Sequence, residues 1–167
     1  GDGSTEAIGE GIAAAGFQPW ATVLGTPRNG GFAYGNNFGF AAAVEGRTPW
    51  GPLRPDVVWL LNPDTEVRPG ALSGVLQFMD SHPQAGIVGT GIENPDGSAW
   101  HSAFHFPTVW TELEHALALG PFTRAIGDKA ILYAPAKAPR RVDWVSGASL
   151  LVRREVIERL GLLDDGY

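Results

Sequence analysis

An aspartate follows an apolar run that has the residue types of a buried strand. The run extends from Val57 to Leu61 and continues into Asn62, Pro63 and Asp64. Because proline cannot donate a hydrogen bond to a neighbouring strand, the strand is expected to end at Pro63. Open α/β sheets bind their ligands just beyond the carboxyl ends of their strands. Asp64, with Asn62 close by, could therefore hold Mg²⁺ or Mn²⁺ against a diphosphate. The competing interpretation is a turn that only caps the next helix.

A glycine-rich stretch, residues 29–39, is the second candidate for ligand binding. It reads Asn-Gly-Gly-Phe-Ala-Tyr-Gly-Asn-Asn-Phe-Gly and leads into an apolar segment. Glycines let the backbone approach a ligand closely, and the N-terminus of a following helix attracts phosphate. The stretch matches neither the dinucleotide fingerprint nor the P-loop. Because glycine-rich turns are common without any ligand, the local sequence leaves both interpretations open.

Residues 142–149, Val-Asp-Trp-Val-Ser-Gly-Ala-Ser, form the third candidate. Trp144 beside the Ser146-Gly147 break could be a platform on which a sugar ring stacks. The alternative is a tryptophan in the core, which is the more common place for one in such a strand. The histidines lack the paired spacing of a metal site, and the absence of a Gly-x-Ser-x-Gly motif weakens a hydrolase interpretation.

The composition is that of an acidic, globular chain. The 167 residues are 44% hydrophobic and 18% charged, with a net charge of -6, which suits one domain with a core. The negative charge argues against nucleic acid as a partner, and the absence of cysteine excludes disulfides and thiolate chemistry. No apolar run approaches the roughly 20 residues of a membrane span, and no signal peptide is recognised, so a cytoplasmic protein is expected. Both ends look truncated.

Helices and strands must alternate to position these candidates. Helical patterns are found at about residues 5–15, 41–44, 69–81, 110–119 and 153–160. Apolar runs predict strands at about residues 20–25, 56–61, 85–89, 141–145 and 148–152. Ser4 or Asp2 is expected to cap the first helix, and Gly16 to end it. This alternation predicts an α/β sandwich around a mostly parallel sheet that is covered on both faces.

Six short motifs follow one another in register along the chain. They are Asp2-Gly-Ser4 before a helix, Asn29-x-Gly-Phe-Ala-x-Gly-Asn-Asn-x-Gly39, Leu60-Leu-Asn-Pro-Asp64, Pro83-x-Ala-Gly-Ile-Val-Gly89, Asn94-Pro-Asp-Gly97, and Trp144-Val-Ser-Gly-Ala148 through Arg153-Arg154. Together they resemble family 2 glycosyltransferases of the GT-A fold, especially the rhamnosyltransferase-like branch. The resemblance covers nearly the whole chain, and residues 121–139 match it least well.

The resemblance implies a GT-A-like α/β fold, a three-layer sandwich with a mostly parallel central sheet. It implies one domain over residues 1–167, with a nucleotide-sugar-binding half at about 1–95 and an acceptor half at about 96–167. The implied enzyme transfers a sugar, with inversion, from a nucleotide-sugar to an acceptor hydroxyl in polysaccharide or cell-surface glycan synthesis. The donor would be dTDP-rhamnose or a UDP-sugar. The acceptor would be a glycan or a lipid-linked sugar, which would bring the protein to the inner face of the membrane.

The same resemblance assigns site residues. Nucleotide-sugar binding is implied for Asn29, Gly31, Asn37, Asn62 and Asp64. Asp64 would bind the divalent metal, Mg²⁺ or Mn²⁺, and Asn62 stands where relatives carry the first aspartate of an Asp-x-Asp motif. The acceptor side would be lined by Trp144, Ser146, Gly147 and Ala148.

Two elements of the family are not seen in the sequence. The strand ending in Asp-Asn that grips the base and ribose is expected before Gly1, and the Glu-Asp pair that supplies the catalytic base is expected beyond Tyr167. Asp164 and Asp165 match the segment before that pair, so neither is assigned as the base. Two other function classes stay open: a nucleotidyltransferase, which would release pyrophosphate, and a non-catalytic nucleotide- or sugar-binding module.

Overall fold

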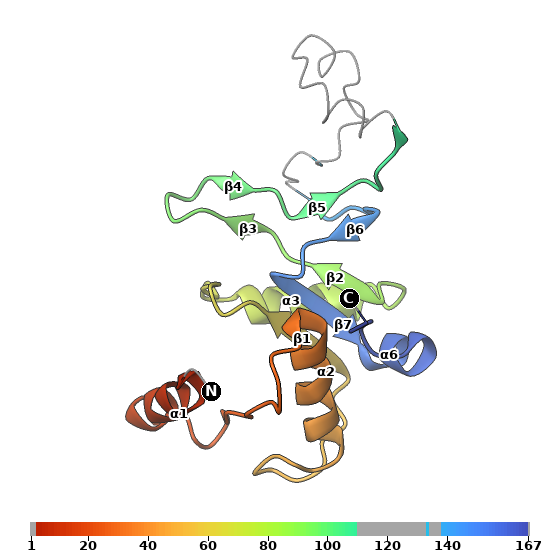
Figure 1. The fold of residues 1–167 in the computed structure, drawn as a ribbon. Coiled ribbons are helices and arrows are strands. Elements are labelled where there is room, and N and C mark those ends of the chain that lie inside the picture. The colour runs from red at the N-terminus through yellow and green to blue at the C-terminus, as the bar shows by residue number, and fades with distance from the viewer. Residues whose placement is uncertain (1–2, 110–132, 134–137, 167) are drawn as a thin grey trace. The chain divides into compact units, whose positions relative to one another are not determined.

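The computed structural model describes residues 3–109, 133 and 138–166 (Figure 1). The chain divides into two compact units. Unit 1 comprises Gly1–Asp56 and Ile157–Tyr167, and unit 2 comprises Val57–Val156. The residues expected to bind a nucleotide-sugar are therefore distributed over both units, with three of them before Asp56 and two after it.

Unit 1 begins with helix α1 (Ser4–Ala14), which ends as the sequence predicts. Gly16 adopts a left-handed conformation, with φ of 71°. Its N–H donates to the carbonyl of Ala13, and the N–H of Phe17 donates to that of Ile12. This paired arrangement satisfies carbonyls that the end of a helix otherwise leaves without a partner.

The start of α1 differs from the expectation. Ser4 lies inside the first turn, and the preceding Gly3, with φ of 77°, takes the N-cap position without any side-chain hydrogen bond to the helix. The cap expected at Ser4 is therefore wrong, because the left-handed Gly3 has already turned the chain into the helix. The other expected cap, Asp2, lies outside the described residues.

Helix α2 (Gly31–Val44) begins well before the expected residues 41–44. Much of the glycine-rich stretch that was interpreted as a turn is helical. The alanines at residues 41–43 favour helix strongly, and Ala42 is fully buried, so packing outweighs the cost of the glycines. At the other end of the helix, Gly46 has φ of 77° and Arg47 donates its N–H to the Ala42 carbonyl.

The strand expected at residues 20–25 is not formed. Residues 18–20 form a turn, and residues 21–26 have no regular secondary structure. A strand needs the N–H and C=O groups of a neighbour, and among the described residues none pairs with this segment. The apolar pattern indicated partial burial correctly, because residues 21, 23 and 24 are half-buried, but it carries no information about a partner.

Unit 2 contains a sheet of three strands: β1 (Val57–Leu61), β2 (Ile87–Gly89) and β7 (Ser149–Arg153). Their order is β1-β7-β2, and β7 runs antiparallel to both neighbours (Figure 1). A mostly parallel sheet is therefore not what the described strands show. β1 and β2 do run in the same direction, but β7 separates them, and an apolar run reports burial rather than the direction of a neighbour.

The core of unit 2 lies on this sheet and on helix α3 (Ala71–Ser81). Leu60, Leu151, Val152 and Met79 are buried. Arg153 joins the helix to the sheet, because its Nη2 donates to the Met79 carbonyl at 2.6 Å and its Nε donates to that of Ala85 at 3.0 Å. A cation at this position also complements the negative end of the helix dipole.

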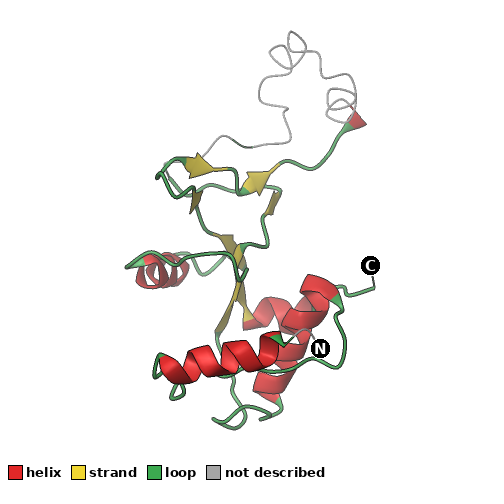
Figure 2. Cartoon of the chain, turned by 60° about the vertical axis from the view of Figure 1, so that its left-hand side comes forward, coloured by secondary structure: helices red, strands yellow, loops and turns green. Residues whose placement is uncertain are grey.

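Two short two-stranded ribbons complete unit 2 (Figure 2). β3 (Ile92–Glu93) pairs with β4 (Ala99–Trp100) around the turn expected at Asn94–Gly97, where Gly97 donates its N–H to the Asn94 carbonyl. The hydroxyl and N–H of Ser98 hold the pKa of Asp96 below its usual value. β5 (Ala103–Phe104) pairs with β6 (Trp144–Val145). The expected helix at residues 110–119 lies outside the described residues, and helix α6 (Arg154–Leu160) follows β7 as expected.

Candidate functional site

A pocket of about 720 Å³ lies in unit 1. The first turn of α1, the loop before α2 and the first turn of α2 contribute its walls. The lining residues are Ser4, Thr5, Thr26, Pro27, Arg28, Asn29, Gly30, Gly31, Tyr34 and Gly35. Two of the sequence-predicted nucleotide-sugar residues, Asn29 and Gly31, are therefore brought together in a cavity large enough for a small-molecule ligand.

Arg28 supplies the positive charge of this pocket. Its guanidinium carbon lies 4.4 Å from the centre of the Tyr34 ring, so the aromatic face orients the cation. Thr26 donates its hydroxyl to the Arg28 carbonyl at 3.0 Å, which fixes the backbone of the loop. A guanidinium that is held in place but still exposed is suited to the oxygens of a phosphate.

The backbone beside Arg28 is shaped for close approach. Asn29 accepts the N–H of Gly31 through its Oδ1 at 3.2 Å. A Cβ added at Gly30 would lie 2.4 Å from the Tyr34 ring, so no larger residue fits without displacing that ring. Because the N-terminal turns of both α1 and α2 also line the pocket, its electrostatic character favours an anion.

Arg28 was not selected from the sequence. Arg28 immediately precedes the glycine-rich stretch, and this position could have identified it. A cation beside a glycine-rich segment that begins a helix can reach the same ligand as the backbone of that segment. The sequence does not show that Tyr34, on the first turn of α2, stacks under the guanidinium.

Asn37, the third expected residue of unit 1, does not line the pocket. Its Nδ2 donates to the Leu163 carbonyl at 2.7 Å, and its Oδ1 accepts the N–H of Leu163 at 3.0 Å. Asn37 therefore fixes the backbone of the loop that leads into Asp164 and Asp165. Its expected contact with a nucleotide-sugar stays a prediction.

In unit 2 the structure brings the end of β1 against the segment before β7. Asn62 donates its N–H to the Ala148 carbonyl at 3.0 Å. Ser146 accepts the N–H of Ala148 through its Oγ at 3.2 Å, which holds the Ser-Gly-Ala segment as a tight turn. The expected metal-side residue Asn62 and the expected acceptor-side residues Ser146, Gly147 and Ala148 are therefore neighbours.

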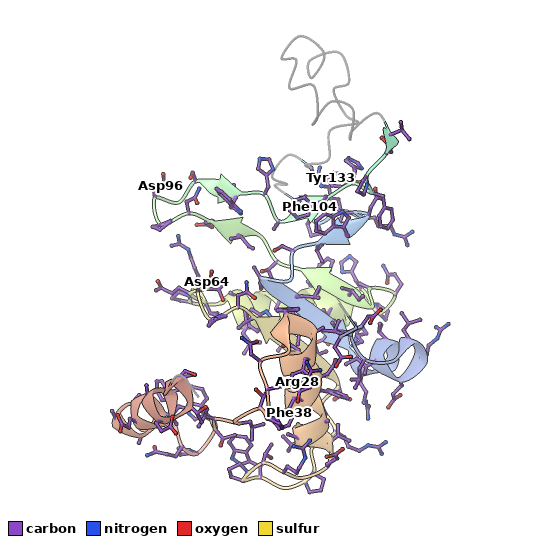
Figure 3. All side chains as sticks on the ribbon, in the orientation of Figure 1. Arg28, Phe38, Asp64, Asp96, Phe104 and Tyr133 are labelled. Carbon is purple, nitrogen blue, oxygen red and sulfur yellow. The ribbon has the colours of Figure 1, made fainter. Side chains whose placement is uncertain are left out.

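Asp64 lies in a turn just beyond β1 (Figure 3). The Asn62 carbonyl accepts both the N–H of Thr65, at 3.1 Å, and its hydroxyl, at 2.6 Å. The turn is thus confirmed, but it does not cap the next helix, because α3 begins at Ala71 with Gly70 as its N-cap. The Asp64 carboxylate is left exposed at the surface. A turn and a ligand site are compatible here, because the turn consumes backbone groups and not the carboxylate.

No group of three or more His, Asp or Glu side chains that could hold a metal gathers anywhere in residues 3–109, 133 and 138–166. The two residues assigned to the metal side supply one carboxylate, from Asp64, and one amide, from Asn62. Such a set fits Mg²⁺ or Mn²⁺ only as part of a shell that substrate phosphate and water complete, which is the usual way in which Mg²⁺ binds.

A buried hydroxyl network lies directly behind the Ala148 contact. Ser149, which is 6% exposed, accepts the indole N–H of Trp59 at 3.0 Å and the hydroxyl of Thr90 at 2.7 Å. Trp59 lies on β1, and Thr90 directly follows β2. Ser149, the first residue of β7, therefore joins all three strands of the sheet. Sequence reasoning missed this network, because a serine inside an apolar strand gives no sign of which groups face it.

Trp144 is not in the core. It remains 41% exposed and stacks on Phe104, its cross-strand neighbour, with ring centroids 4.0 Å apart. The core interpretation is therefore wrong, because β6 directs its other residue, Val145, towards Gly89 of the sheet. Trp144 stands on the opposite face of the ribbon.

Comparison with known proteins finds similarity to a sugar transferase. The chain is 31% identical over 175 aligned positions to N-acetylglucosaminyl-diphospho-decaprenol L-rhamnosyltransferase of Mycobacterium tuberculosis, both in strain CDC 1551 / Oshkosh and in strain ATCC 25618 / H37Rv. The alignment covers 99% of the chain and 54% of the relative, so the chain spans about half the length of the curated relatives it matches. No family model and no solved structure matches the chain. The similarity supports the resemblance to glycosyltransferases that the six motifs suggested.

Proposed function

We propose that this chain is part of a glycosyltransferase that moves a sugar from a nucleotide-sugar to a hydroxyl of a lipid-linked glycan acceptor. The observation that carries the proposal is the 31% identity with a rhamnosyltransferase over 99% of the chain. A single short motif could match a family by chance. Six motifs in the same order, together with an alignment over 99% of the chain, are not expected by chance. The family 2 assignment and the GT-A fold belong to the same proposal.

The pocket of unit 1 is proposed to bind an anionic group such as a phosphate. The Arg28 cation, the backbone at Gly30 and Gly31, and two helix N-termini all favour a ligand with negative charge. The relative is named for rhamnose, and dTDP-rhamnose is therefore the first donor to test, with UDP-sugars next. Asn29 and Gly31 would approach the nucleotide as the motif resemblance implies.

The proposed metal residue is Asp64. Its carboxylate is exposed just beyond β1, with the half-buried Asn62 two residues before it. When bound, Mg²⁺ or Mn²⁺ would neutralise charge on the departing nucleoside diphosphate. Transfer with inversion also requires a carboxylate base within hydrogen-bond reach of the acceptor hydroxyl, and no described residue is assigned to that role.

The acceptor is proposed to be a sugar carried on a lipid diphosphate, in cell-surface polysaccharide synthesis. The relative acts on N-acetylglucosaminyl-diphospho-decaprenol by its name, and such an acceptor would place the protein at the inner face of a membrane. No helix among residues 3–109, 133 and 138–166 is long and apolar enough to cross a membrane.

The proposal is tested with the full-length protein, a panel of nucleotide-sugars and N-acetylglucosaminyl-diphospho-farnesol, a short-chain acceptor. The expected result is a glycosylated acceptor and a free nucleoside diphosphate in equal amounts, with Mg²⁺ or Mn²⁺ present. Release of pyrophosphate instead would favour the nucleotidyltransferase. Binding of a donor by calorimetry without any transfer would favour a non-catalytic module.

A further inference from the structure

The amide of Asn37 binds one residue of a distant loop through both of its polar atoms. Its Nδ2 donates to the Leu163 carbonyl at 2.7 Å, and its Oδ1 accepts the Leu163 N–H at 3.0 Å. The side chain thus supplies one donor and one acceptor to a single peptide residue, as a neighbouring strand would. Asn37 lies on α2 and Leu163 follows α6, and both belong to unit 1. This pair of hydrogen bonds, the Asn37 clamp, joins segments that are far apart in the sequence.

The Asn37 clamp anchors the loop at residues 162–166. The Asp164 carboxylate accepts the N–H of Gly166 at 3.0 Å, but this bond lies within the loop. In the part of the chain that the structure describes, the two bonds to Asn37 are the only hydrogen bonds that join this loop to another segment. Loss of the amide would therefore release the loop from α2.

The clamp lies on the same face of α2 as a wall of the unit 1 pocket. Tyr34 lines that pocket, and Asn37 follows it by three positions on the helix. Residues three apart are neighbours on a helix surface, with a rise of about 4.5 Å along the axis. Asn37 itself does not line the pocket. It therefore holds the loop at 162–166 about one helical turn away from the pocket.

The loop and the pocket have complementary electrostatic characters. The loop carries two exposed carboxylates, those of Asp164 and Asp165. The pocket, with Arg28 and two helix N-termini, favours an anion. A sugar that leaves a phosphate develops positive charge on its ring, which nearby carboxylates would stabilise. Such stabilisation requires groups that are already in position, so it would be lost from a loop that moves.

We propose that Asn37 is a positioning residue for sugar transfer, which acts by holding the loop at 162–166 and not by contacting the nucleotide-sugar. The proposal rests on the proposed function, which supplies the transfer reaction. It differs from the role that the motif resemblance implies for Asn37. Loss of a residue that contacts the donor would weaken donor binding, whereas loss of a positioning residue would lower kcat and leave donor binding intact.

The first experiment tests the clamp and requires no catalysis. Hydrogen–deuterium exchange of the full-length protein is followed by mass spectrometry in the peptide that contains Leu163. Asn37→Ala is expected to accelerate exchange in this peptide by about tenfold, because the loop loses its anchor. Asn36, the neighbour of Asn37 on α2, donates to the Phe32 carbonyl of its own helix, so Asn36→Ala should leave the exchange unchanged. Equal exchange in Asn37→Ala and the wild type would overturn the proposal.

The second experiment separates donor binding from transfer. Asn37→Ala is expected to lower kcat by about 100-fold, as misplacement of a catalytic group can do. The Kd in calorimetry, with dTDP or with UDP according to which the wild type binds, should change by less than about twofold. Gln18→Ala is the control, because Gln18 is an exposed amide of unit 1 outside the pocket, and it should change neither quantity. A weaker Kd with an unchanged kcat would overturn the proposal in favour of a donor contact.

The third experiment uses Asn37→Asp to report on the clamp during turnover. The introduced carboxylate can accept the Leu163 N–H but cannot donate to the Leu163 carbonyl. Once protonated, it supplies one donor and one acceptor, as the amide does. The kcat of this variant relative to the wild type is therefore expected to rise as the pH falls from about 8 to about 5. A ratio that does not change with pH would overturn the proposal. A wild type that shows the exchange effect of the clamp but transfers no sugar would refute the proposed function instead.

Discussion

Ser149 offers a stability prediction that can be worked from the structure. Ser149→Ala removes the acceptor of two hydrogen bonds, from the Trp59 indole at 3.0 Å and from the Thr90 hydroxyl at 2.7 Å. The site is 6% exposed, so water cannot replace the lost oxygen without moving the strands. A buried donor left without a partner costs about 1–3 kcal/mol. The Thr90 hydroxyl can rotate towards another acceptor, but the indole N–H cannot, so most of the loss comes from Trp59.

We expect Ser149→Ala to lower the free energy of unfolding by about 2–3 kcal/mol, which corresponds to about 4–12 °C in melting temperature for a chain of this size. Thr90→Val removes only one donor and leaves Ser149 bonded to Trp59, so its expected loss is about 1 kcal/mol. Ser73→Ala is the matched control, because Ser73 is exposed and its hydroxyl donates only to the Gly70 carbonyl.

The assay is urea denaturation of the full-length protein followed by circular dichroism, with the double variant Ser149→Ala/Thr90→Val completing a thermodynamic cycle. The two changes are expected to be non-additive, because they remove the same hydrogen bond. A Ser149→Ala midpoint within error of that of Ser73→Ala would refute the argument that the three strands depend on this serine.

Three further predictions concern charged residues. Arg28→Met is expected to weaken dTDP binding by about tenfold in calorimetry. Arg54 is an exposed arginine of the same unit that does not line the pocket, so Arg54→Met should leave the Kd unchanged. Equal effects of the two substitutions would contradict a phosphate contact at Arg28. Asp64→Ala is expected to reduce Mn²⁺-dependent transfer by at least about 100-fold with the fold retained, and full turnover would refute the metal assignment. Arg153→Met keeps the apolar stem but removes the bonds to the carbonyls of Met79, in the last turn of α3, and of Ala85. The expected loss is about 1–3 kcal/mol in urea denaturation, and Arg153→Lys should recover part of it.

Local features of the fold could be predicted from the sequence because they depend on one or two residues. Gly16 ends α1 since only glycine reaches its positive φ without strain, and Asn94–Gly97 forms the hairpin turn for the same reason. The end of β1 at Leu61, shortly before Pro63, is equally local. Each of these features depends on conformational preferences that neighbours in space do not change.

The features that could not be predicted depend on partners distant in sequence. Residues 20–25 have a strand pattern, yet they form no strand among the described residues because hydrogen-bond partners, and not composition, define one. The sequence favoured a core position for Trp144, and only its pairing with Phe104 and the inward Val145 settles its face. The cation of the pocket, Arg28, was passed over because the aromatic ring that orients it is on the following helix.

The direction of β7 has a consequence for the candidate site. In the antiparallel register, Leu61 is opposite Ser149 and Val57 is opposite Arg153. The carboxyl end of β1 therefore meets the amino end of β7, and Asn62 bonds to Ala148. A parallel pair would instead have placed Asn62 beside the start of α6, away from the Ser146–Gly147 turn. The mostly parallel sheet expected from the apolar runs would thus have separated the metal-side and acceptor-side residues, and it is the antiparallel insertion of β7 between β1 and β2 that makes them neighbours.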